Sequence, residues 1–276
     1  MKKVLIIDSM NLIHRARVAM RQSENGTTYA ALRMIRSLVN KFEPDIAYFV
    51  LEGKPLRRIE ESGGTYKAQR ESADDSFWIQ QKQIVETVTK YLPVVVAKHP
   101  HYEADDVIAY LASSRHANDY VTIVSTDTDF IQLLDKKRLT LDLFSPIKDI
   151  MVKAPDYNYV EWKALRGDGA DNIPGIPGIG DKRAEKLLTE AGALKQFFVK
   201  KPEAKQLWEH NCSMIRFENL EDKKSEIQFS IAKQDNDSLR ESLRAFGIQS
   251  MTSDKSWGPW KNTFNNLWLN SRSLSY

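Results

Sequence analysis

Short apolar runs recur along the first half of the chain, and three of them stop at an acidic residue. Residues 4–7 stop at Asp8, residues 47–51 stop at Glu52, and residues 121–126 stop at Asp127. Runs that are short, rich in β-branched residues and nearly unbroken are typical of strands buried on both faces of a parallel sheet. Because parallel strands point the same way, we expect the three acids to meet at one edge of the sheet, where open α/β folds bind ligands.

Strand-like and helix-like patterns alternate from the N-terminus to about residue 144. The expected strands lie at about 3–8, 46–52, 93–98, 120–126 and 139–144, and the expected helices near 28–42, 74–91, 103–116 and 128–135. This alternation predicts an α/β fold with a mostly parallel central sheet flanked by helices. After about residue 155 the helical pattern takes over, which indicates a helical subdomain packed against the sheet.

The chain is expected to divide into three parts. These are an α/β core at residues 1–155, a helical subdomain at 156–250 and an aromatic-containing tail at 251–276. Within the core, residues 53–73 fit no regular element, and a long crossover of this kind is usually functional or disordered. In the tail, four aromatic residues recur at spacings of three or four, which is typical of an amphipathic helix. They are Trp257, Trp260, Phe264 and Trp268, and we expect them to pack onto the helical subdomain.

Composition limits the class of protein and the kind of metal. The chain has 276 residues, 42% of them apolar, which is enough for a large globular domain with a smaller one. No apolar stretch approaches the roughly 20 residues that cross a bilayer, and the N-terminus runs directly into a strand, so we expect a cytoplasmic protein. A single cysteine, Cys212, excludes an intramolecular disulfide, and the five histidines lack the spacing of zinc ligands. Any bound metal is therefore expected to be a hard cation with oxygen ligands.

Basic residues gather near the acidic strand ends, although the net charge is only +3. After the first strand come Arg15, Arg17, Arg21, Arg33 and Arg36, and after the second come Lys54, Arg57, Arg58, Lys67 and Arg70. A basic rim around an acidic centre suits a polyanion whose phosphate approaches a metal. Solvated helix faces are the alternative interpretation of the same residues.

Further acids follow the later strands. Glu103 and Asp106 share one face of a helix that begins there, although acids at a helix start can also be simple caps. Asp127 and Asp129 straddle one residue directly after a buried strand, so both can reach one site. Crowded carboxylates raise one another's pKa unless a cation lies among them. We therefore expect a metal-dependent active site at this edge of the sheet.

A glycine-rich segment at residues 167–183 lies between two helical patterns. Gly178 and Gly180 are typical of the hairpin of a helix-hairpin-helix unit, whose backbone amides can hold a phosphate at a helix N-terminus. Lys182 and Arg183 follow at once, which favours this interpretation over a tight turn between packed helices. The segment lacks the preceding strand and the glycine spacing of dinucleotide and nucleotide loops.

Taken in order, these motifs resemble those of the flap endonuclease and 5′-exonuclease family. The resemblance is carried by Asp8, Glu52 and residues 66–70, 103–106, 125–129 and 167–173. It spans roughly residues 2–220 and is highly specific as an ordered set. The chain looks most like the stand-alone bacteriophage enzymes of this family, including those called ribonuclease H. The implied fold is that of the 5′-nucleases and PIN-like proteins, with a helix-hairpin-helix in the helical part.

The resemblance also implies a set of site residues. Its metal positions, for two Mg²⁺ ions that Mn²⁺ can replace, match Asp8, Glu52, Glu103, Asp105, Asp106, Asp127, Asp129, Asp168 and Asp171. Two basic residues, Lys67 and Arg70, match positions that stabilise charge on the scissile phosphate, in an arch segment at about residues 53–90. Tyr66 matches a position that stacks on a base, with a core tyrosine as the alternative. The family usually has aspartate at the position of Glu52.

DNA binding is expected from the basic rim and the hairpin. The residues in this set are Arg15, Arg33, Arg57, Arg58, Gly175, Gly178, Gly180, Lys182 and Arg183. By resemblance the hairpin grips the backbone of duplex DNA without reading its sequence, and its carbonyls hold a K⁺ ion.

The implied activity is structure-specific 5′ to 3′ hydrolysis of DNA and RNA:DNA hybrids, which removes RNA primers or 5′ flaps during replication. The implied substrates are branched or nicked duplex DNA and RNA:DNA hybrid, acted on by a monomer, in the host cytoplasm if a bacteriophage encodes the chain. A replication clamp or single-strand DNA-binding protein is an alternative partner for the aromatic tail. Two other functions remain open, namely a PIN-like endoribonuclease and a non-catalytic nucleic-acid scaffold. Residues 54–73 and 167–183 argue against the endoribonuclease, which lacks an arch and a helix-hairpin-helix.

Overall fold

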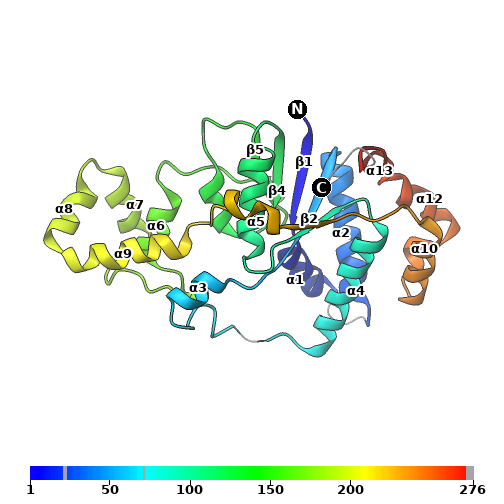
Figure 1. Cartoon of the computed structure of the whole chain (residues 1–276), viewed down its shortest axis with the longest axis horizontal. Coiled ribbons are helices and arrows are strands. Elements are labelled where there is room, and N and C mark those ends of the chain that lie inside the picture. The colour runs from blue at the N-terminus through cyan, green and yellow to red at the C-terminus, as the bar shows by residue number, and fades with distance from the viewer. Residues whose placement is uncertain (21–23, 71, 272–276) are drawn as a thin grey trace.

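The structure is a computed structural model that describes residues 1–20, 24–70 and 72–271. At its centre lies a seven-stranded sheet with the strand order β6-β5-β4-β1-β2-β3-β7 (Figure 1). The strands are β1 (Lys3–Asp8), β2 (Ile46–Leu51), β3 (Val95–Lys98), β4 (Tyr120–Val124), β5 (Leu141–Ser145), β6 (Ile150–Met151) and β7 (Gln228–Ser230). The first five pair in parallel and the two short edge strands pair antiparallel, which confirms the expected mostly parallel sheet. Arg21 and the last five residues of the expected tail lie outside the described residues.

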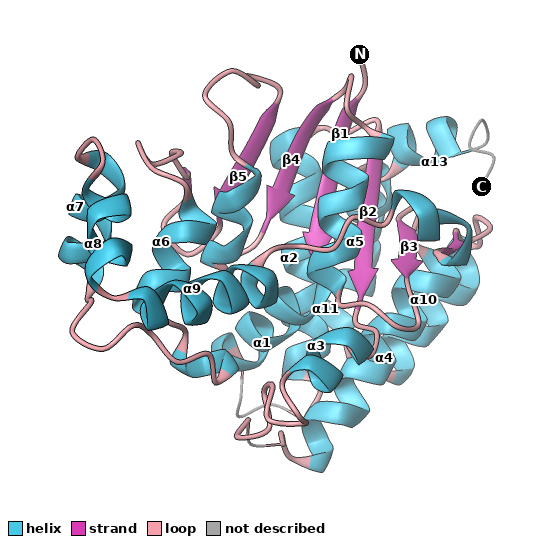
Figure 2. Cartoon of the chain, turned by 60° about the vertical axis from the view of Figure 1, so that its left-hand side comes forward, coloured by secondary structure: helices cyan, strands magenta, loops and turns pink. Residues whose placement is uncertain are grey.

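Helices cover both faces of the sheet and extend beyond it (Figure 2). The α-helices are α1 (Ser9–Ala19), α2 (Gly26–Phe42), α3 (Leu56–Glu61), α4 (Asp75–Tyr91), α5 (Ala104–Tyr110), α6 (Tyr159–Arg166), α7 (Asp181–Thr189), α8 (Ala193–Lys200), α9 (Pro202–Ile215), α10 (Asn236–Ala245), α11 (Gln249–Thr252), α12 (Asp254–Asn262) and α13 (Asn265–Ser271). A π-helical turn, η1 (Leu111–Arg115), extends α5, and three 3₁₀ segments are η2 (Thr128–Leu133), η3 (Gly169–Asp171) and η4 (Glu221–Glu226). Among the described residues, no helix has the length and apolar character that crossing a bilayer requires.

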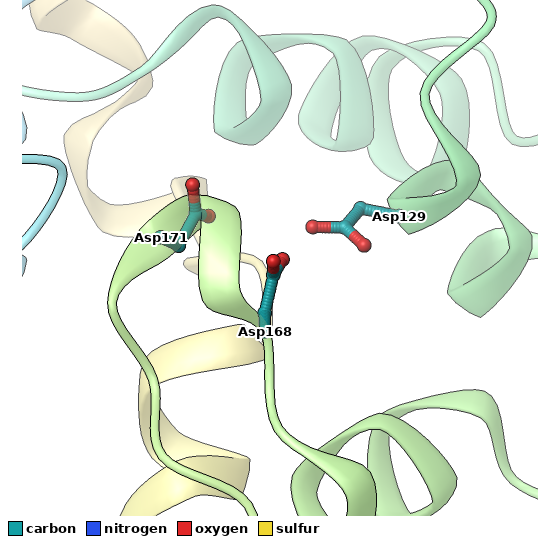
Figure 3. Close-up of side chains that lie close together, drawn as sticks. All are labelled: Asp129, Asp168 and Asp171. Atoms are coloured by element: carbon teal, nitrogen blue, oxygen red, sulfur yellow. The ribbon is translucent and has the colours of Figure 1, made fainter. Parts of the chain in front are cut away.

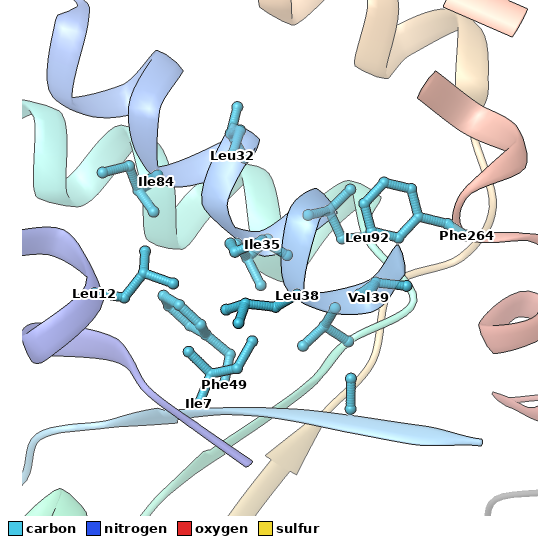
Figure 4. Close-up of a cluster of buried hydrophobic side chains, with 14 of the residues drawn as sticks. Ile7, Leu12, Leu32, Ile35, Leu38, Val39, Phe49, Ile84, Leu92 and Phe264 are labelled. Carbon is cyan, nitrogen blue, oxygen red and sulfur yellow. The ribbon is translucent and has the colours of Figure 1, made fainter. Parts of the chain in front are cut away.

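One face of the sheet packs against α1, α2 and α4 in the larger hydrophobic core (Figure 4). Ile7 and Phe49, from neighbouring strands, are fully buried there beneath Ile35 of α2. The other face packs against α5 and η1, where Ile6 and Ile108 are equally buried. Both faces of the strands are thus covered, which is why their sequences are apolar without alternation.

The helix α1 has no counterpart among the expected elements. It begins directly after β1, and the Asp8 side chain caps it by accepting a hydrogen bond from the Asn11 backbone N–H at 3.1 Å. Leu12, Ile13 and Ala16 form its buried face. This i, i+1, i+4 spacing is typical of an amphipathic helix. It covers only about one and a half turns before charged residues follow, which is too short to predict a helix.

The C-terminal aromatic residues pack elsewhere than expected. Trp257, Trp260, Phe264 and Trp268 are buried in the core that contains α2, so the expectation that they pack onto the helical subdomain is wrong. Figure 4 places Phe264 beside Val39 of α2. The spacing of apolar residues in an amphipathic helix predicts which face is buried, but it does not predict which other element packs against that face.

The C-terminal part of the expected helical subdomain packs against the sheet domain instead of against the helices before it. Helices α6–α9 gather to one side of the sheet around two small hydrophobic clusters (Figure 1). From Gln228 onward, however, β7 pairs with β3, and α10 contacts α4. Residues 156–250 therefore do not form one packed unit.

The expected arch segment at residues 53–90 is shorter in the structure. Its second half is α4, where Phe77, Ile84 and Val88 are fully buried in the larger core. The crossover itself consists of α3 and a series of turns that ends at residue 70 before the undescribed residue 71. This first part lies outside the larger core, although Tyr66 packs in one of the small clusters, and it stands beside the carboxyl ends of the strands.

Candidate functional site

The carboxyl ends of the parallel strands bring the predicted acids together. Asp8 closes β1 opposite Val50 of β2, so Glu52 lies just beyond it, and Asp127 follows the end of β4. A cavity of about 430 Å³ opens at this edge. Its acidic lining residues are Glu103, Asp105, Asp127, Asp129, Asp168 and Asp171. The expectation that acids far apart in the sequence meet at one edge therefore agrees with the geometry.

Four of the predicted acids, Asp8, Glu52, Asp105 and Asp127, form a group that we call the inner acids, of which Asp105 and Asp127 line the cavity. Burial raises the pKa of Asp8 to about 6, and the negative charge of Asp127 adds to the effect. Part of Glu52 is open to solvent, yet desolvation of its carboxyl raises its pKa to about 7. The pKa of Asp105 is also raised well above its usual value, first by burial and then by repulsion from Glu52, Asp8 and Asp127.

A small hydrogen-bond network holds Asp8 in place. Its second oxygen accepts a hydrogen bond from Ser125 Oγ at 2.8 Å, and Ser125 Oγ also accepts one from the Asp127 backbone N–H at 3.0 Å. Asn11 Nδ2 donates to Thr126 Oγ1 at 2.6 Å, which ties α1 to the loop after β4. Sequence reasoning gave Ser125 and Asn11 no role, although each lies within three residues of a predicted acid.

The side chain of Glu52, one methylene longer than the aspartate expected at this position, reaches the start of α5. Its Oε2 accepts a hydrogen bond from the Ala104 backbone N–H at 3.1 Å, at the start of α5. The neighbouring Gly53 packs so closely that a Cβ there would lie 1.9 Å from the His99 carbonyl oxygen. The longer side chain is thereby anchored to the helix that carries Asp105.

Three more aspartates form a second group, the outer aspartates. Asp129, Asp168 and Asp171 each offer a carboxylate oxygen within 4.8 Å of the other two (Figure 3). Lys163, from α6, forms ion pairs with Asp129 and with Asp168 Oδ2, the latter at 2.6 Å. Burial raises the pKa of Asp129 to about 6. Burial would raise the pKa of Asp168 as well, but the hydrogen bond and charge of Lys163, together with backbone N–H donors, outweigh burial, and the pKa is lowered.

Asp106 is a buried ion-pair partner rather than a cavity residue. It is fully buried, and Arg58 donates to both of its oxygens at 2.8 Å. Arg58 also donates to Glu103 Oε2 at 2.7 Å and is itself 4% exposed. The expectation that Arg58 binds DNA is therefore wrong, because its guanidinium is used inside the protein. Asp106 and Arg58 instead fix the position of Glu103.

The turn at residues 66–70 faces the cavity but is not helical. Lys67 has a left-handed backbone with φ 55°, and its ammonium pairs with Glu103. Arg70 pairs with Asp171 Oδ1 at 2.6 Å. Tyr66 is 8% exposed and donates its hydroxyl hydrogen to Glu103 Oε2 at 3.0 Å, as the alternative of a core tyrosine predicts. Tyr66 is therefore mostly covered, although part of it lines the cavity.

The hairpin between α6 and α7 has the geometry expected of a helix-hairpin-helix. Gly178 adopts φ 78°, and Gly175 packs so closely that a Cβ would lie 2.1 Å from the Arg166 carbonyl oxygen. Gly180 directly precedes α7, and Lys182 and Arg183 are exposed on its first turn. Arg183 also donates to the Gly178 carbonyl at 3.1 Å.

The remaining predicted DNA contacts lie outside the cavity lining. Arg15 is half-buried on α1, and Arg33 is exposed on α2. Arg57 pairs with Glu61 at 2.6 Å and with Glu218, so its guanidinium is engaged on the protein surface. None of these three contributes to the basic lining of the cavity, which comes from Arg58, Lys67, Arg70, Lys163 and Arg166.

The donor set suits hard divalent cations. Both groups offer carboxylate oxygens, which Mg²⁺ and Mn²⁺ prefer. Within the described part of the chain, the inner acids form no ion pair with a basic side chain, so their mutual repulsion lacks direct compensation. A bound cation would supply the missing charge.

Comparisons with known proteins agree with this geometry. Residues 3–162 match the family described as "5'-3' exonuclease, N-terminal resolvase-like domain", and residues 154–244 match "5'-3' exonuclease, C-terminal SAM fold". The chain is 29% identical to a 5'-3' exonuclease of Aquifex aeolicus, over 91% of this chain and 94% of that protein. It is 30% identical to one of Mycoplasmopsis pulmonis, over 71% and 69%. A DNA polymerase I of Thermus filiformis is 33% identical, but the match covers only 24% of that longer protein.

Solved structures show the same fold at low sequence identity. A bacteriophage T5 flap endonuclease, in a complex with DNA and metal ions, superposes with a TM-score of 0.67 and 19% identity, over 98% of this chain and all of that one. The catalytic core of Rad2 with a DNA substrate superposes with a TM-score of 0.58 and 17% identity, over 94% and 92%. A bacteriophage T5 5'-exonuclease structure holds bound zinc ions.

Proposed function

The chain belongs to the 5'-3' exonuclease family and is a nuclease, and from this premise we propose which substrates and metal ions it uses. The proposed activity is structure-specific hydrolysis of phosphodiester bonds from the 5′ side, in DNA and in RNA:DNA hybrids, with two Mg²⁺ ions. One observation carries the proposal. Two groups of carboxylates lie at one cavity, and basic side chains that could meet a phosphate lie at the same cavity.

The inner acids would hold one ion and the outer aspartates the other. Glu103 lies between the groups and is bound to Lys67, Arg58 and Tyr66, so we assign it to the inner position with its orientation fixed by these three. Asp106 is not assigned to an ion because it is fully buried against Arg58 and, unlike Glu103, does not line the cavity. When bound, two such ions activate a water molecule and stabilise the leaving oxygen.

The residues of the chain supply the remaining functions. Lys67 and Arg70 reach the cavity from the crossover, where a scissile phosphate would exchange their present carboxylate partners for phosphate oxygens. Ser125 and Asn11 keep Asp8 and the loop after β4 in a fixed relation, so the inner acids need little rearrangement. The buried Arg58 prevents Glu103 from turning out of the cavity.

The hairpin would hold the duplex backbone beside the cavity. Exposed backbone amides at the start of α7, with Lys182 and Arg183, suit a phosphate contact that is independent of sequence. A K⁺ ion is part of the proposal, and carbonyls of the hairpin would hold it; in the structure the Gly178 carbonyl accepts a hydrogen bond from Arg183.

The biological substrates proposed are RNA primers and 5′ flaps on branched or nicked duplexes at replication forks. The relatives named DNA polymerase I support this setting, since the present chain matches about a quarter of their length. A clamp or single-strand DNA-binding partner would have to use a surface other than the rings of Trp257, Trp260 and Phe264, because these are buried. A cytoplasmic monomer remains the expected form.

A 5′-flap duplex, incubated with the protein with and without Mg²⁺, tests the proposal. We expect cleavage near the junction that depends on Mg²⁺. Cleavage restricted to single-stranded RNA would favour the endoribonuclease alternative. Tight binding of the flap without cleavage, with either Mg²⁺ or Mn²⁺, would favour the scaffold alternative.

A further inference from the structure

Lys163 lies among the outer aspartates, and no motif in the sequence drew attention to it. It comes from the middle of α6 and is only 6% exposed. Its ammonium pairs with Asp129 from η2, which follows β4, and with Asp168 at the start of the hairpin segment. These elements come from different parts of the chain, so Lys163 joins the α/β core to the helical part.

The partners of Lys163 are also the proposed ligands of the outer ion. An ammonium group carries three N–H donors and a full positive charge. Two of those donors point at carboxylates that lie within 4.8 Å of each other and of Asp171. A divalent ion that bridges Asp129 and Asp168 would need the same oxygens and would meet the repulsion of the ammonium.

The inner acids differ in this respect. Lys67 is the nearest basic side chain, but its ion pair is with Glu103, not with Asp8, Glu52, Asp105 or Asp127. The charge of Lys67 still reaches Asp8, Glu52 and Asp105 and opposes the rise in their pKa values, but Lys67 forms no ion pair with any of the inner acids. The two proposed ion positions therefore differ before any metal binds. At the inner position Lys67 and Arg58 pair with Glu103 alone, and the four inner acids form no ion pair with any residue that the structure describes. At the outer position every aspartate is paired, two of them with Lys163 and Asp171 with Arg70.

We propose that Lys163 is the resident counter-ion of the outer aspartates, and that a divalent ion binds there only when this ammonium moves away. The inference rests on the proposed function and deepens it by giving the two ions an order. The inner position fills first, and the outer position fills at higher metal concentration. A substrate phosphate would favour the second step, because its oxygens offer the displaced ammonium new acceptors.

Mn²⁺ titration of the metal-free protein, followed by the electron paramagnetic resonance signal of free Mn²⁺, tests this order without relying on activity. Wild type is expected to bind one ion tightly and a second ion weakly. Lys163→Met removes the charge but keeps most of the side-chain volume, and it should tighten the second site by at least about tenfold while leaving the first unchanged. Lys163→Arg keeps the charge and should leave the second site weak. Lys205→Met, on the exposed face of α9, is the matched control and should bind as wild type does.

Thermal unfolding provides a second readout. In chelator, Lys163→Met should melt below wild type, since the outer aspartates lose their counter-ion. With saturating Mn²⁺ its melting temperature should rise by more than that of wild type. If Lys163→Met does not fold, Lys163→Gln is titrated in its place.

Some outcomes would overturn the inference and leave the proposed function intact. One is a wild type that binds two ions while Lys163→Met binds the second no more tightly. Another is a Lys163→Met protein that loses the second ion, which would make Lys163 a positioning residue rather than a competitor. Binding of no Mn²⁺ by any of the proteins would instead remove the proposed metal centre itself.

Discussion

Arg58 and Asp106 form a bidentate ion pair inside the protein, with Nη1 and Nη2 of Arg58 each 2.8 Å from an oxygen of Asp106. Arg58 also donates to the backbone carbonyls of Met214 and Arg216, both at 3.1 Å. The pair therefore connects the crossover, the start of α5 and the end of α9. These three segments surround Glu103, so the pair fixes this acid before any cation binds.

Replacement of Arg58 by methionine should destabilise the protein strongly. The change leaves the buried Asp106 carboxylate without its partner, and breaking such a pair typically costs about 3–5 kcal/mol in the free energy of unfolding. Urea unfolding in chelator measures the loss. The double variant Arg58→Met, Asp106→Leu should recover part of it, since no buried charge remains. Arg33→Met, on the exposed face of α2, should change the free energy of unfolding by less than about 0.5 kcal/mol. If Arg58→Met also lowered the free energy of unfolding by less than about 0.5 kcal/mol, the ion pair would not contribute to stability.

Asp127→Asn should abolish cleavage and leave substrate binding nearly unchanged. The amide cannot replace the carboxylate as a ligand, while the basic residues at the cavity and the hairpin remain. We expect the single-turnover rate on a 5′-flap duplex to fall by at least about 100-fold, with a similar dissociation constant measured in Ca²⁺. Asp135→Asn, at an exposed position outside the cavity, is the control and should cleave normally. Normal turnover by Asp127→Asn would contradict its assignment as a ligand.

Metal binding should release protons, and the number released should fall as the pH rises. Without metal, burial raises the pKa of Asp8 to about 6, of Glu52 to about 7 and of Asp129 to about 6, so these groups hold protons that a cation must displace. The unfolded chain, with carboxyl pKa values near 4, binds fewer protons over this range. These carboxylates therefore lower the free energy of unfolding of the metal-free protein above about pH 7. This destabilisation disappears as the pH falls through their folded-state pKa values.

Calorimetric titration with Mg²⁺ in two buffers of different ionisation enthalpy measures these protons. We expect one or more to be released per protein near pH 6, and almost none near pH 8. Affinity should be weaker at the lower pH. Glu52→Gln should release fewer protons than wild type near pH 6. Release that is independent of pH would mean that the inner acids are already ionised.

Lys182→Ala should weaken DNA binding to the same extent for every sequence. Lys182 is exposed at the start of α7, where a phosphate contact carries no sequence information. Wild-type binding should weaken steeply with salt, and the variant should reduce the slope of log affinity against log salt by about 1. Lys255→Ala, exposed on α12, is the control for loss of one positive charge. Equal slopes for wild type and Lys182→Ala would exclude a phosphate contact at this residue.

The sheet and the meeting of its acids could be predicted because both follow from local pattern. An apolar run that ends in an acid defines a strand and its end, and the parallel direction of the strands then places Asp8, Glu52 and Asp127 at one edge. The helices α2 and α4 were predicted within two residues of their ends for the same reason. These features depend on neighbours in sequence and on one rule of topology.

The features that sequence reasoning missed depend on contacts between distant segments. Arg58 lies in residues 53–73, where the sequence predicted no regular element. Its sequence neighbours therefore did not indicate that its guanidinium is buried against Asp106. Lys163 has helical neighbours typical of any amphipathic segment, and only the folded chain places it between Asp129 and Asp168. The rings at Trp257 and Trp260 showed that a face is buried, but their partner, α2, lies far away in the sequence.

Anomalous diffraction from a crystal soaked in Mn²⁺ tests the central claim, that the two groups of acids form one centre for divalent ions. We predict two peaks at this edge of the sheet, one in contact with Asp8 and Asp127 and a weaker one in contact with Asp168 and Asp171. Peaks only at other surfaces, or no peak beside either group at saturating Mn²⁺, would contradict it.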